Sequence, residues 1–211
     1  LESRGFFVAD ESYSNFNQTS LSLASSMNMM YLDVMAELLG ENTFNSYASI
    51  YMIENSTVEA MLHEIGYQTA SFYSETFFTN FKGRDYYFKP ENIPPSYLQI
   101  FLRNTAMSVI LNSKFYDWHR NTITYSIDTL PDVTKLKGPQ FTFAHILCPH
   151  PPFVFNSDGT PREAKRLYAI HDVNRFLHDG TVEEYRNGYK DQISYLQDEI
   201  LTMVDRIQQN A

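Results

Sequence analysis

The sequence predicts an α/β fold with a largely parallel sheet. Short apolar runs, which are typical of buried strands, alternate with segments whose apolar residues recur every three to four positions, as in helices. The resulting order is strand, helix, helix, strand, helix, strand, helix, which is typical of parallel strands joined by helical crossovers. No fixed-period repeat, low-complexity segment or linker interrupts the chain, so we predict one domain over residues 1–211.

The N-terminal third of the chain supplies the first strand and two helices. Residues 6–9 (Phe-Phe-Val-Ala) form a short apolar run that predicts a buried strand. After a polar loop, apolar residues at helical spacing predict a helix over residues 18–38, and Gly40 ends it. Ser56 followed by Glu59 is a capping-box signature, which predicts a helix over residues 57–65.

The middle of the chain alternates in the same way. Residues 67–73 follow the helix-ending Gly66 and predict a strand. Residues 77–95 are aromatic and irregular, and residues 96–111 predict a further helix. We expect the aromatic run over residues 72–88 to serve core and loop packing, because the net charge is acidic and basic residues are not interleaved with the rings as in a nucleic-acid stacking surface.

The C-terminal part contains the strongest strand prediction. A segment of mixed character, residues 118–137, leads to Gln-Phe-Thr-Phe-Ala-His-Ile-Leu-Cys at residues 140–148. Prolines bound this run, because proline cannot donate a hydrogen bond to a sheet. The last segment, residues 185–207, predicts a helix with one apolar face.

Composition excludes several classes of function. The net charge is −9, with 16 Lys and Arg against 25 Asp and Glu, which argues against a nucleic-acid partner. Cys148 is the single cysteine, so an internal disulfide or a cysteine-based zinc site is excluded. No apolar run approaches the length of about 20 residues that spans a membrane, and no signal-peptide pattern opens the chain.

A hydroxyl-rich helix start is the first candidate site. Thr19 and Ser20 stand at the expected N-terminus of the helix over residues 18–38. Unpaired N–H groups and the helix dipole favour an anion there and help to activate an attacking oxygen, although a hydroxyl still needs a base or a metal. The alternative is that Thr19 or Ser20 only caps the helix.

The second candidate site is the C-terminal end of the strongest strand with the proline-rich segment that follows it. His145 lies near the end of that strand and His150 among the prolines, where open α/β sheets place ligand contacts. Five residues of continuing strand would put the two rings on opposite faces, so they would not share a metal unless the prolines bend the chain. The alternative is that both are packed loop histidines.

The remaining reactive side chains carry weaker predictions. Cys148 is a poor nucleophile candidate, since strand spacing places neither neighbouring histidine against it. His171 and His178 are expected on a surface helix, and we predict structural roles for His63 and His119. Serine-hydrolase elbow, metalloprotease and dinucleotide- or phosphate-loop motifs are absent from the sequence.

Four segments, in order along the chain, resemble the sulfatase-like hydrolases of the alkaline phosphatase superfamily, which include lipoteichoic acid synthases and phosphoethanolamine transferases. Residues 15–25 resemble the nucleophile region of that family, and residues 63–69 its helix-Gly-Tyr-x-Thr-strand step. Residues 141–153 resemble its strand ending in a His-Pro-rich loop, and residues 185–207 its long helix before the last metal-binding strand.

The resemblance implies a fold and a set of roles. It implies a three-layer α/β/α architecture of the alkaline phosphatase type, here incomplete, that acts on phosphate or sulfate esters. Thr19 is implied as the covalent nucleophile and a metal ligand, with Ser20 as the fallback nucleophile. His150, with His145 beside it, is implied as a contact to the anionic ester. A divalent metal (Zn, Mn, Mg or Ca) is implied in the intact protein, where it would lower the pKa of the nucleophile.

The chain departs from the family pattern at both ends. The family's first-strand carboxylate would precede Leu1, and its Asp-His-Gly motif would follow Ala211. Asp10 and Glu11 do not match these ligands, and the sulfatase Cys-x-Pro-x-Arg motif is absent. We therefore expect a central excerpt of a catalytic domain that is inactive alone and binds no metal strongly.

The resemblance also carries expectations about location and partners. It implies an extracytoplasmic domain of a membrane protein, anchored only by segments outside this chain. An excerpt of a sheet leaves an unpaired edge, so self-association is expected. The alternative to the enzyme is a non-catalytic binding or interaction domain that keeps the α/β fold. A zinc protein based on His145 and His150 is a third interpretation.

Overall fold

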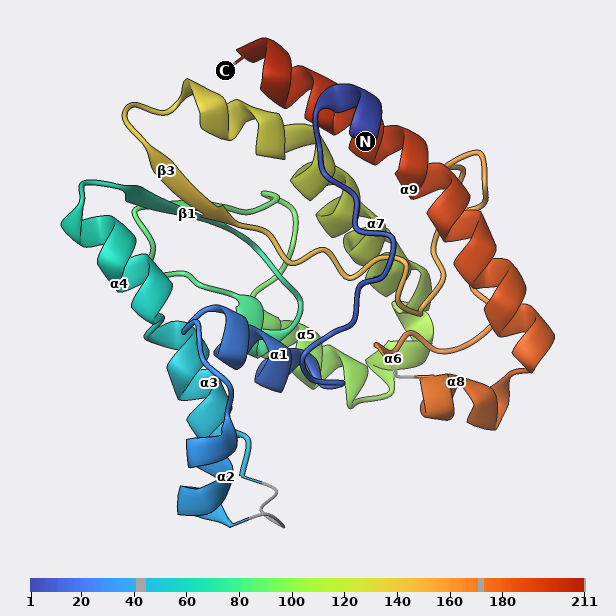
Figure 1. The fold of residues 1–211 in the computed structure, drawn as a ribbon. Helices are drawn as coiled ribbons and strands as arrows, with labels where there is room; N and C mark the ends of the chain where they lie inside the picture. Colours follow the sequence, from blue (N-terminus) through green and yellow to red (C-terminus); the bar gives the residue numbers. More distant parts are fainter. Residues whose placement is uncertain (41–44, 171–172, 211) are drawn as a thin grey trace. The chain divides into compact units, whose positions relative to one another are not determined.

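The computed structural model describes residues 1–40, 45–170 and 173–210 (Figure 1). Helices and a small three-stranded sheet make up the structure, which confirms the mixed α/β class. The chain divides into two compact units. Unit 1 comprises Leu1–Ser71, Thr76–Tyr87 and Leu136–Phe143; unit 2 comprises Phe72–Glu75, Phe88–Lys135 and Ala144–Ala211. The single domain over residues 1–211 stays a prediction.

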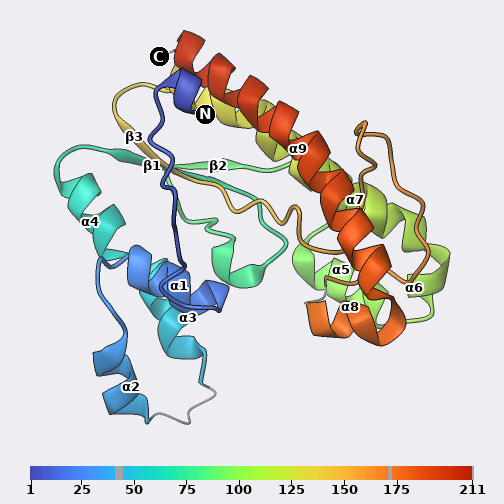
Figure 2. The same cartoon turned by 45° about the vertical axis from the view of Figure 1, so that its right-hand side comes forward.

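The strands of the sheet are β1 (Gln68–Phe72), β2 (Tyr86–Phe88) and β3 (Gln140–Phe143), in the order β2-β1-β3. Both Figure 1 and Figure 2 show β3 alongside β1, and Figure 2 also labels β2. β1 and β3 are parallel, with Gln68 opposite Gln140 and Ser71 opposite Phe143. The strand predicted at residues 67–73 and its parallel pairing are therefore confirmed.

Two strand predictions need correction. The run over residues 140–148 is a strand only as far as Phe143, where its register with β1 ends, and the prolines beyond cannot extend a ladder. Residues 6–9 are not a strand, and Phe7 is 93% exposed. An apolar run forms a buried strand only when another strand pairs with it, and the described residues place none beside this one.

The helix predicted over residues 18–38 is also wrong as one element. It consists of α1 (Thr19–Ser26) and α2 (Asp33–Leu39), separated by a turn in which Met29 has a φ of 53°. The Ser25 hydroxyl donates to the Met30 carbonyl over 2.5 Å and stabilises this turn. The apolar residues keep helical spacing across residues 27–32, although local hydrogen bonds interrupt the helix there.

The remaining helices of unit 1 are α3 (Tyr47–Glu54) and α4 (Thr57–Glu64), with short 3-10 turns at Glu2–Arg4 and Phe77–Thr79. The Glu59 N–H donates to the Ser56 hydroxyl over 3.2 Å, which confirms the predicted start of α4. The core of unit 1 consists of buried apolar side chains from several of these elements: Ala24, Leu32, Ile53 and Phe81.

Unit 2 is built mainly from helices. They are α5 (Ser96–Arg103), α6 (Met107–Ile110), α7 (Asn112–Thr129), the 3-10 turn Leu130–Lys135, α8 (Val173–Asp179) and α9 (Val182–Asn210). The helix predicted over residues 96–111 is thus divided into α5 and α6. The helix predicted over residues 185–207 is confirmed within α9.

Helix α7 is the main element that sequence periodicity missed. Several of its buried positions are polar, among them His119, Thr122 and Ser126, and they interrupt the apolar stripe that marks a helix. α7 and α9 lie side by side in both views of the fold (Figures 1 and 2), and they contact each other. The core of unit 2 includes Phe115 and Ile123 from α7 and Leu196 from α9.

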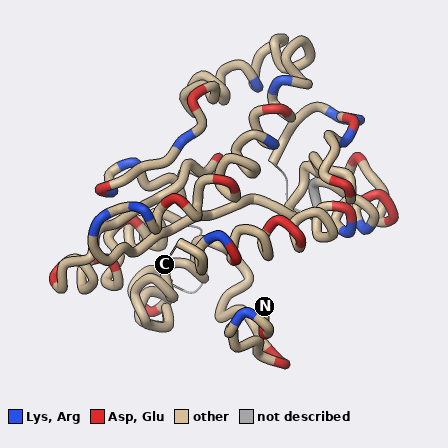
Figure 3. The backbone as a smooth tube through the Cα atoms, turned by 90° about the horizontal axis from the view of Figure 1, so that it is seen from above, with Lys and Arg blue, Asp and Glu red and all other residues tan. Residues whose placement is uncertain are grey.

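Charged residues of both signs follow one another along the backbone (Figure 3). Several form ion pairs within a unit, such as Arg84 with Glu59 in unit 1 and Arg162 with Asp191 in unit 2, each at 2.5 Å. The Arg84–Glu59 pair is largely buried and the Arg162–Asp191 pair is half-buried, and each pair fixes the direction of a long side chain.

Candidate functional site

The candidate nucleophile Thr19 is the first residue of α1 in unit 1, and its side chain is exposed. Gln18 is the N-cap residue, and no side chain caps the helix. The interpretation of Thr19 or Ser20 as a mere helix cap is therefore wrong. Ser20 is half-buried one position further along the helix. The Thr19 hydroxyl thus stands at the positive end of a helix dipole without a capping role.

The loop before α1 is held by hydrogen bonds to the first turn of the helix. The Asn15 side-chain oxygen accepts from the Ser22 hydroxyl at 2.7 Å and from the Phe16 N–H at 3.1 Å. The Ser14 hydroxyl donates to the Phe16 carbonyl at 2.5 Å. Ser14 and Ser22 are therefore engaged in local structure, and the hydroxyl-rich sequence is partly explained by this turn.

His145 and His150 both lie in the loop after β3, in unit 2, and both are half-buried. The predicted separation onto opposite faces does not apply, because β3 ends at Phe143, before either histidine. Burial lowers the pKa of His145, and the charge of His150 lowers it further. His145 is thus a neutral imidazole at pH 7.

The ring of His150 has a defined hydrogen bond. Its Nδ1 lies 2.6 Å from the Pro151 carbonyl oxygen. A carbonyl only accepts, so Nδ1 carries the proton and donates. With the proton on Nδ1, Nε2 is an acceptor in the neutral ring. In the charged ring Nε2 is also protonated and is a second donor. Only the charged ring donates from Nε2 to an ester oxygen.

Cys148 lies between the two histidines in sequence and is half-buried. Burial raises the pKa of its thiol to about 12. The thiol is therefore protonated at neutral pH, and a thiol is a much weaker nucleophile than a thiolate. This agrees with the prediction that Cys148 is a poor nucleophile.

His63 and His178 lie apart, in units 1 and 2, and form no shared site within the described part of the chain. His63 is exposed on α4, and His178 is exposed on α8, where its Nδ1 lies 2.9 Å from the Asp179 carboxylate. His171 lies outside the described residues, so its predicted place on a surface helix is not addressed.

A buried network of three side chains was missed by sequence reasoning. In unit 2, the carboxylate of Glu75 pairs with Nδ1 of His119 on α7. The Tyr168 hydroxyl donates to the other carboxylate oxygen of Glu75 over 2.9 Å. His119 is 1% exposed and Glu75 7%, so His119 has the structural environment that was predicted but also an acidic partner.

The network determines the ionisation of Glu75. Burial alone would raise the pKa of Glu75, but the charge of His119 and hydrogen bonds from His119 and Tyr168 outweigh it, and the pKa is lowered. Burial and the adjacent Glu75 charge raise the pKa of Tyr168 well above its usual value. Nε2 of His119 is buried and has no hydrogen-bond partner among the described residues.

Sequence spacing could not have revealed this network. Glu75 and His119 are 44 residues apart, and Tyr168 lies 93 residues beyond Glu75. A cavity of about 10 Å³ beside Glu75 and His145 has room for about one water molecule, so the network does not adjoin a substrate-sized space on that side.

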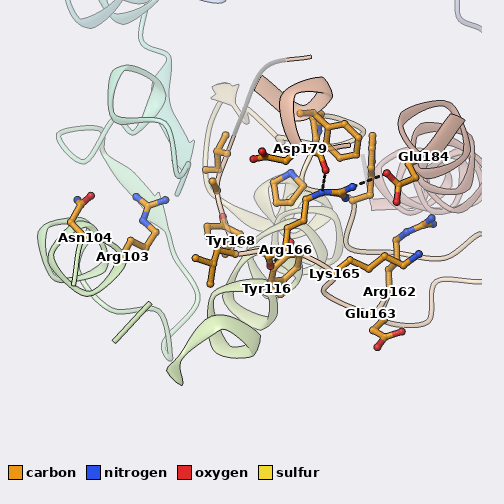
Figure 4. Close-up of a pocket in the computed structure, with 17 residues that line it drawn as sticks. Arg103, Asn104, Tyr116, Arg162, Glu163, Lys165, Arg166, Tyr168, Asp179 and Glu184 are labelled. Atoms are coloured by element: carbon orange, nitrogen blue, oxygen red, sulfur yellow. Dashed lines mark hydrogen bonds and ion pairs between the residues drawn. The ribbon is translucent and has the colours of Figure 1, made fainter. Parts of the chain in front are cut away.

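A substrate-sized cavity does occur elsewhere in unit 2 (Figure 4). It measures about 720 Å³, within the range of small-molecule sites. Its walls include Pro151 and Pro152, which directly follow His150, and the ring of Tyr168. Charged lining residues are Arg103, Arg162, Glu163, Lys165, Arg166, Asp179 and Glu184.

The described residues do not form a metal site. No group of three or more His, Cys, Asp or Glu side chains among residues 1–40, 45–170 and 173–210 could hold a metal ion. Thr19, implied as a metal ligand, is therefore not joined by a ligand set in the part of the chain that the structure describes. The zinc interpretation based on His145 and His150 likewise has no third ligand there.

None of the described helices is long and apolar enough to cross a membrane.

Comparisons with known proteins add no further assignment. No protein-family model, curated protein or solved structure matches the chain.

Proposed function

We propose that the chain is part of a metal-dependent hydrolase or transferase of phosphate or sulfate esters, related to the sulfatase-like members of the alkaline phosphatase superfamily. In this proposal the Thr19 oxygen attacks the phosphorus or sulfur of the ester, the bond to the alcohol oxygen breaks, the alcohol leaves, and the phosphoryl or sulfuryl group stays on Thr19. His150 contacts the ester oxygens. The finer fold assignment, a three-layer sandwich of the alkaline phosphatase type, belongs to the same proposal, as does an extracytoplasmic location.

One observation carries the proposal. The helix α1 begins at Thr19, whose exposed hydroxyl is not used as a cap. A nucleophile of this class needs an accessible oxygen at a position where partial positive charge stabilises an anionic ester, and the N-terminus of a helix provides it. The parallel pairing of β1 with β3 also agrees with an α/β domain whose ligand loops follow its strands.

In this proposal the metal ligands belong to parts of the intact protein outside this chain, as the resemblance implies. Among the described residues, no group of three or more His, Cys, Asp or Glu side chains could hold a metal ion. No base is hydrogen-bonded to Thr19 among the side-chain contacts of α1. Ester turnover is therefore expected from the intact protein that contains these residues and not from the isolated chain.

The test compares Thr19→Ala, Thr19→Ser and Ser20→Ala in the intact protein. Turnover of p-nitrophenyl phosphate, bis-p-nitrophenyl phosphate and p-nitrophenyl sulfate is measured with Mg²⁺, Mn²⁺, Ca²⁺ or Zn²⁺. We expect Thr19→Ala to abolish turnover, Thr19→Ser to retain part of it and Ser20→Ala to resemble the wild type. Mass spectrometry of acid-quenched enzyme should find the phosphoryl or sulfuryl adduct on Thr19.

Two outcomes would contradict the proposal. Full activity of Thr19→Ala would remove Thr19 from the reaction. Failure of the intact protein to turn over every ester, with each metal, would favour the non-catalytic binding domain. A separate variant, His150→Gln, is expected to raise KM more than it lowers kcat if His150 binds ester oxygens.

A further inference from the structure

The cavity of unit 2 has two kinds of positively charged side chain, those that are paired and those that are not. The Arg166 guanidinium bonds the Glu184 carboxylate at 2.7 Å and the Asp179 carbonyl at 3.0 Å (Figure 4). Arg162 bonds Asp191 at 2.5 Å. Both guanidinium groups already use N–H donors in bonds to protein groups, so we assign them mainly a structural role in the cavity wall.

Arg103, by contrast, keeps its hydrogen-bond donors. It comes from the last turn of α5, and none of the described residues forms a hydrogen bond or ion pair with its guanidinium. Its guanidinium carbon lies 5.8 Å from the centroid of the Tyr168 ring. This cation–π contact orients the group without using its N–H donors, which remain available for a ligand anion.

The ring that orients Arg103 is itself held firmly. The Tyr168 hydroxyl donates to Glu75 at 2.9 Å, and its backbone N–H donates to the Asn112 side-chain oxygen at 2.7 Å. Asn112 also donates to the Arg166 carbonyl at 2.9 Å, so one α7 side chain fixes the path of this wall. The buried Glu75 network thereby acquires a role as the support of the cavity wall.

The rest of the lining suits an organic group with a single anionic substituent. Phe153, Leu167, Ile170 and Phe176 supply apolar surface. Among the described residues the charged lining is nearly balanced, with the acidic groups Glu163, Asp179 and Glu184 beside the basic ones, and this balance disfavours a polyanion. Figure 4 shows Arg103 on one side of the cavity, and Lys165 on the opposite side.

We propose that this cavity binds a phosphate or sulfate monoester with an apolar or ring-shaped organic group, and that Arg103 holds its anionic end. The identity of the anion rests on the proposed function, because a guanidinium also binds carboxylates. The existence of the site does not, since Thr19 is not among its residues.

Binding to the full chain tests this inference without turnover. The probes are phenyl phosphate, phenyl sulfate, benzoate, inorganic phosphate and phenol, measured by isothermal titration calorimetry. We expect phenyl phosphate or phenyl sulfate to bind more tightly than the other three. Arg103→Gln should weaken that binding about 10-fold, because it removes a charge-assisted bidentate contact.

Matched variants separate the contribution of the ligand's anionic group to affinity from that of its apolar group. Lys165→Gln should weaken phenyl phosphate about threefold, since this exposed charge is screened. Leu167→Ser, at an exposed apolar lining position, should weaken phenyl phosphate but leave inorganic phosphate unchanged. Lys114→Gln removes an exposed charge of α7 that does not line the cavity, and it should change no affinity.

Several results would overturn the inference. Unchanged affinity of phenyl phosphate in Arg103→Gln would remove Arg103 from the anion site, and tighter binding of phenol than of phenyl phosphate would remove the anion requirement. Equal binding of benzoate would overturn the ester assignment. Thr19→Ala is expected to bind phenyl phosphate normally, so lost turnover with normal binding in that variant separates the nucleophile from the cavity.

Discussion

His119 shows how much a single residue depends on its environment. Sequence reasoning predicted a structural histidine, and its burial agrees with that. Its partner, however, is a carboxylate that the fold brings from 44 residues away. Burying an ionisable group costs free energy unless it is paired. Each of the two side chains therefore lowers the cost of burying the other. The pair belongs to the stability of unit 2 and to the support of Tyr168.

Removing one member of this pair should strongly destabilise the protein. Glu75→Gln leaves His119 buried without its counter-charge, and we expect a loss of about 3 to 5 kcal/mol in the free energy of unfolding at pH 7. Urea denaturation followed by circular dichroism measures it. Asp132→Asn breaks the exposed pair with Lys135 and should leave stability unchanged. Equal stability of the two variants would contradict the role of Glu75.

The same pair makes stability depend on pH in one direction. The pKa of Glu75 is lowered in the folded state, from an ordinary value of 4.5. Its contribution is therefore complete above about pH 4.5 and is lost as the pH falls through the lower, folded-state pKa. Below pH 4.5 the free energy of unfolding should fall more steeply with decreasing pH in the wild type than in Glu75→Gln. Parallel plots of this free energy against pH would show that Glu75 does not cause the dependence.

Among the elements, helices with a clear start or a long apolar face were predictable, and helices with polar buried positions were not. The Ser56 cap identified the start of α4, and apolar spacing identified most of α9. α7 was missed because its buried His119, Thr122 and Ser126 have partners only in the folded protein. Local sequence does not contain those partners.

Gly188 provides a test at this scale. It lies inside α9, where glycine costs about 1 kcal/mol relative to alanine. A Cβ there would stand 2.3 Å from the ring of Phe153, which packs against Tyr185 and Phe176. Gly188→Ala should therefore lower the melting temperature in spite of its better helix propensity, since overpacking costs about 1–3 kcal/mol.

Two comparisons check the cause of that effect. Gly83→Ala meets no atom within 4 Å and should be neutral. Phe153→Leu should recover part of the stability lost in Gly188→Ala, because the smaller side chain leaves room for the new methyl group. An increase in melting temperature for Gly188→Ala alone would show that the close contact with Phe153 does not limit this position.

For the whole molecule, the sheet edge is the feature with a clear consequence. β3 pairs with β1 on one side, and the described residues place no strand on its other side. An edge strand can pair with a second chain. We expect the average mass in sedimentation equilibrium to rise with concentration, and Thr142→Lys, which puts a charge on β3, to abolish the rise.

The matched control for this prediction is Ser12→Lys, which adds the same charge to an exposed loop of unit 1. It should associate like the wild type. A monomeric mass of the wild type at every concentration would overturn the prediction, and equal loss of association in both variants would assign the effect to net charge instead of to β3.

The sequence alone determined the features that depend on neighbouring residues and on composition. These are the mixed α/β class, the β1 segment, the capped start of α4, most of α9 and the proline-rich loop that carries His150. Their signals are short-range, because capping, apolar alternation and the chemistry of proline act over a few residues.

Only the tertiary structure decided the rest. It ended β3 at Phe143, divided the helix over residues 18–38, left residues 6–9 exposed and brought Glu75 to His119 and Tyr168. Each of these depends on a partner distant in the sequence: a strand that pairs, a ring that packs or a charge that compensates burial. Such partners become neighbours only when the chain has folded, and the Arg103 cavity exists for the same reason.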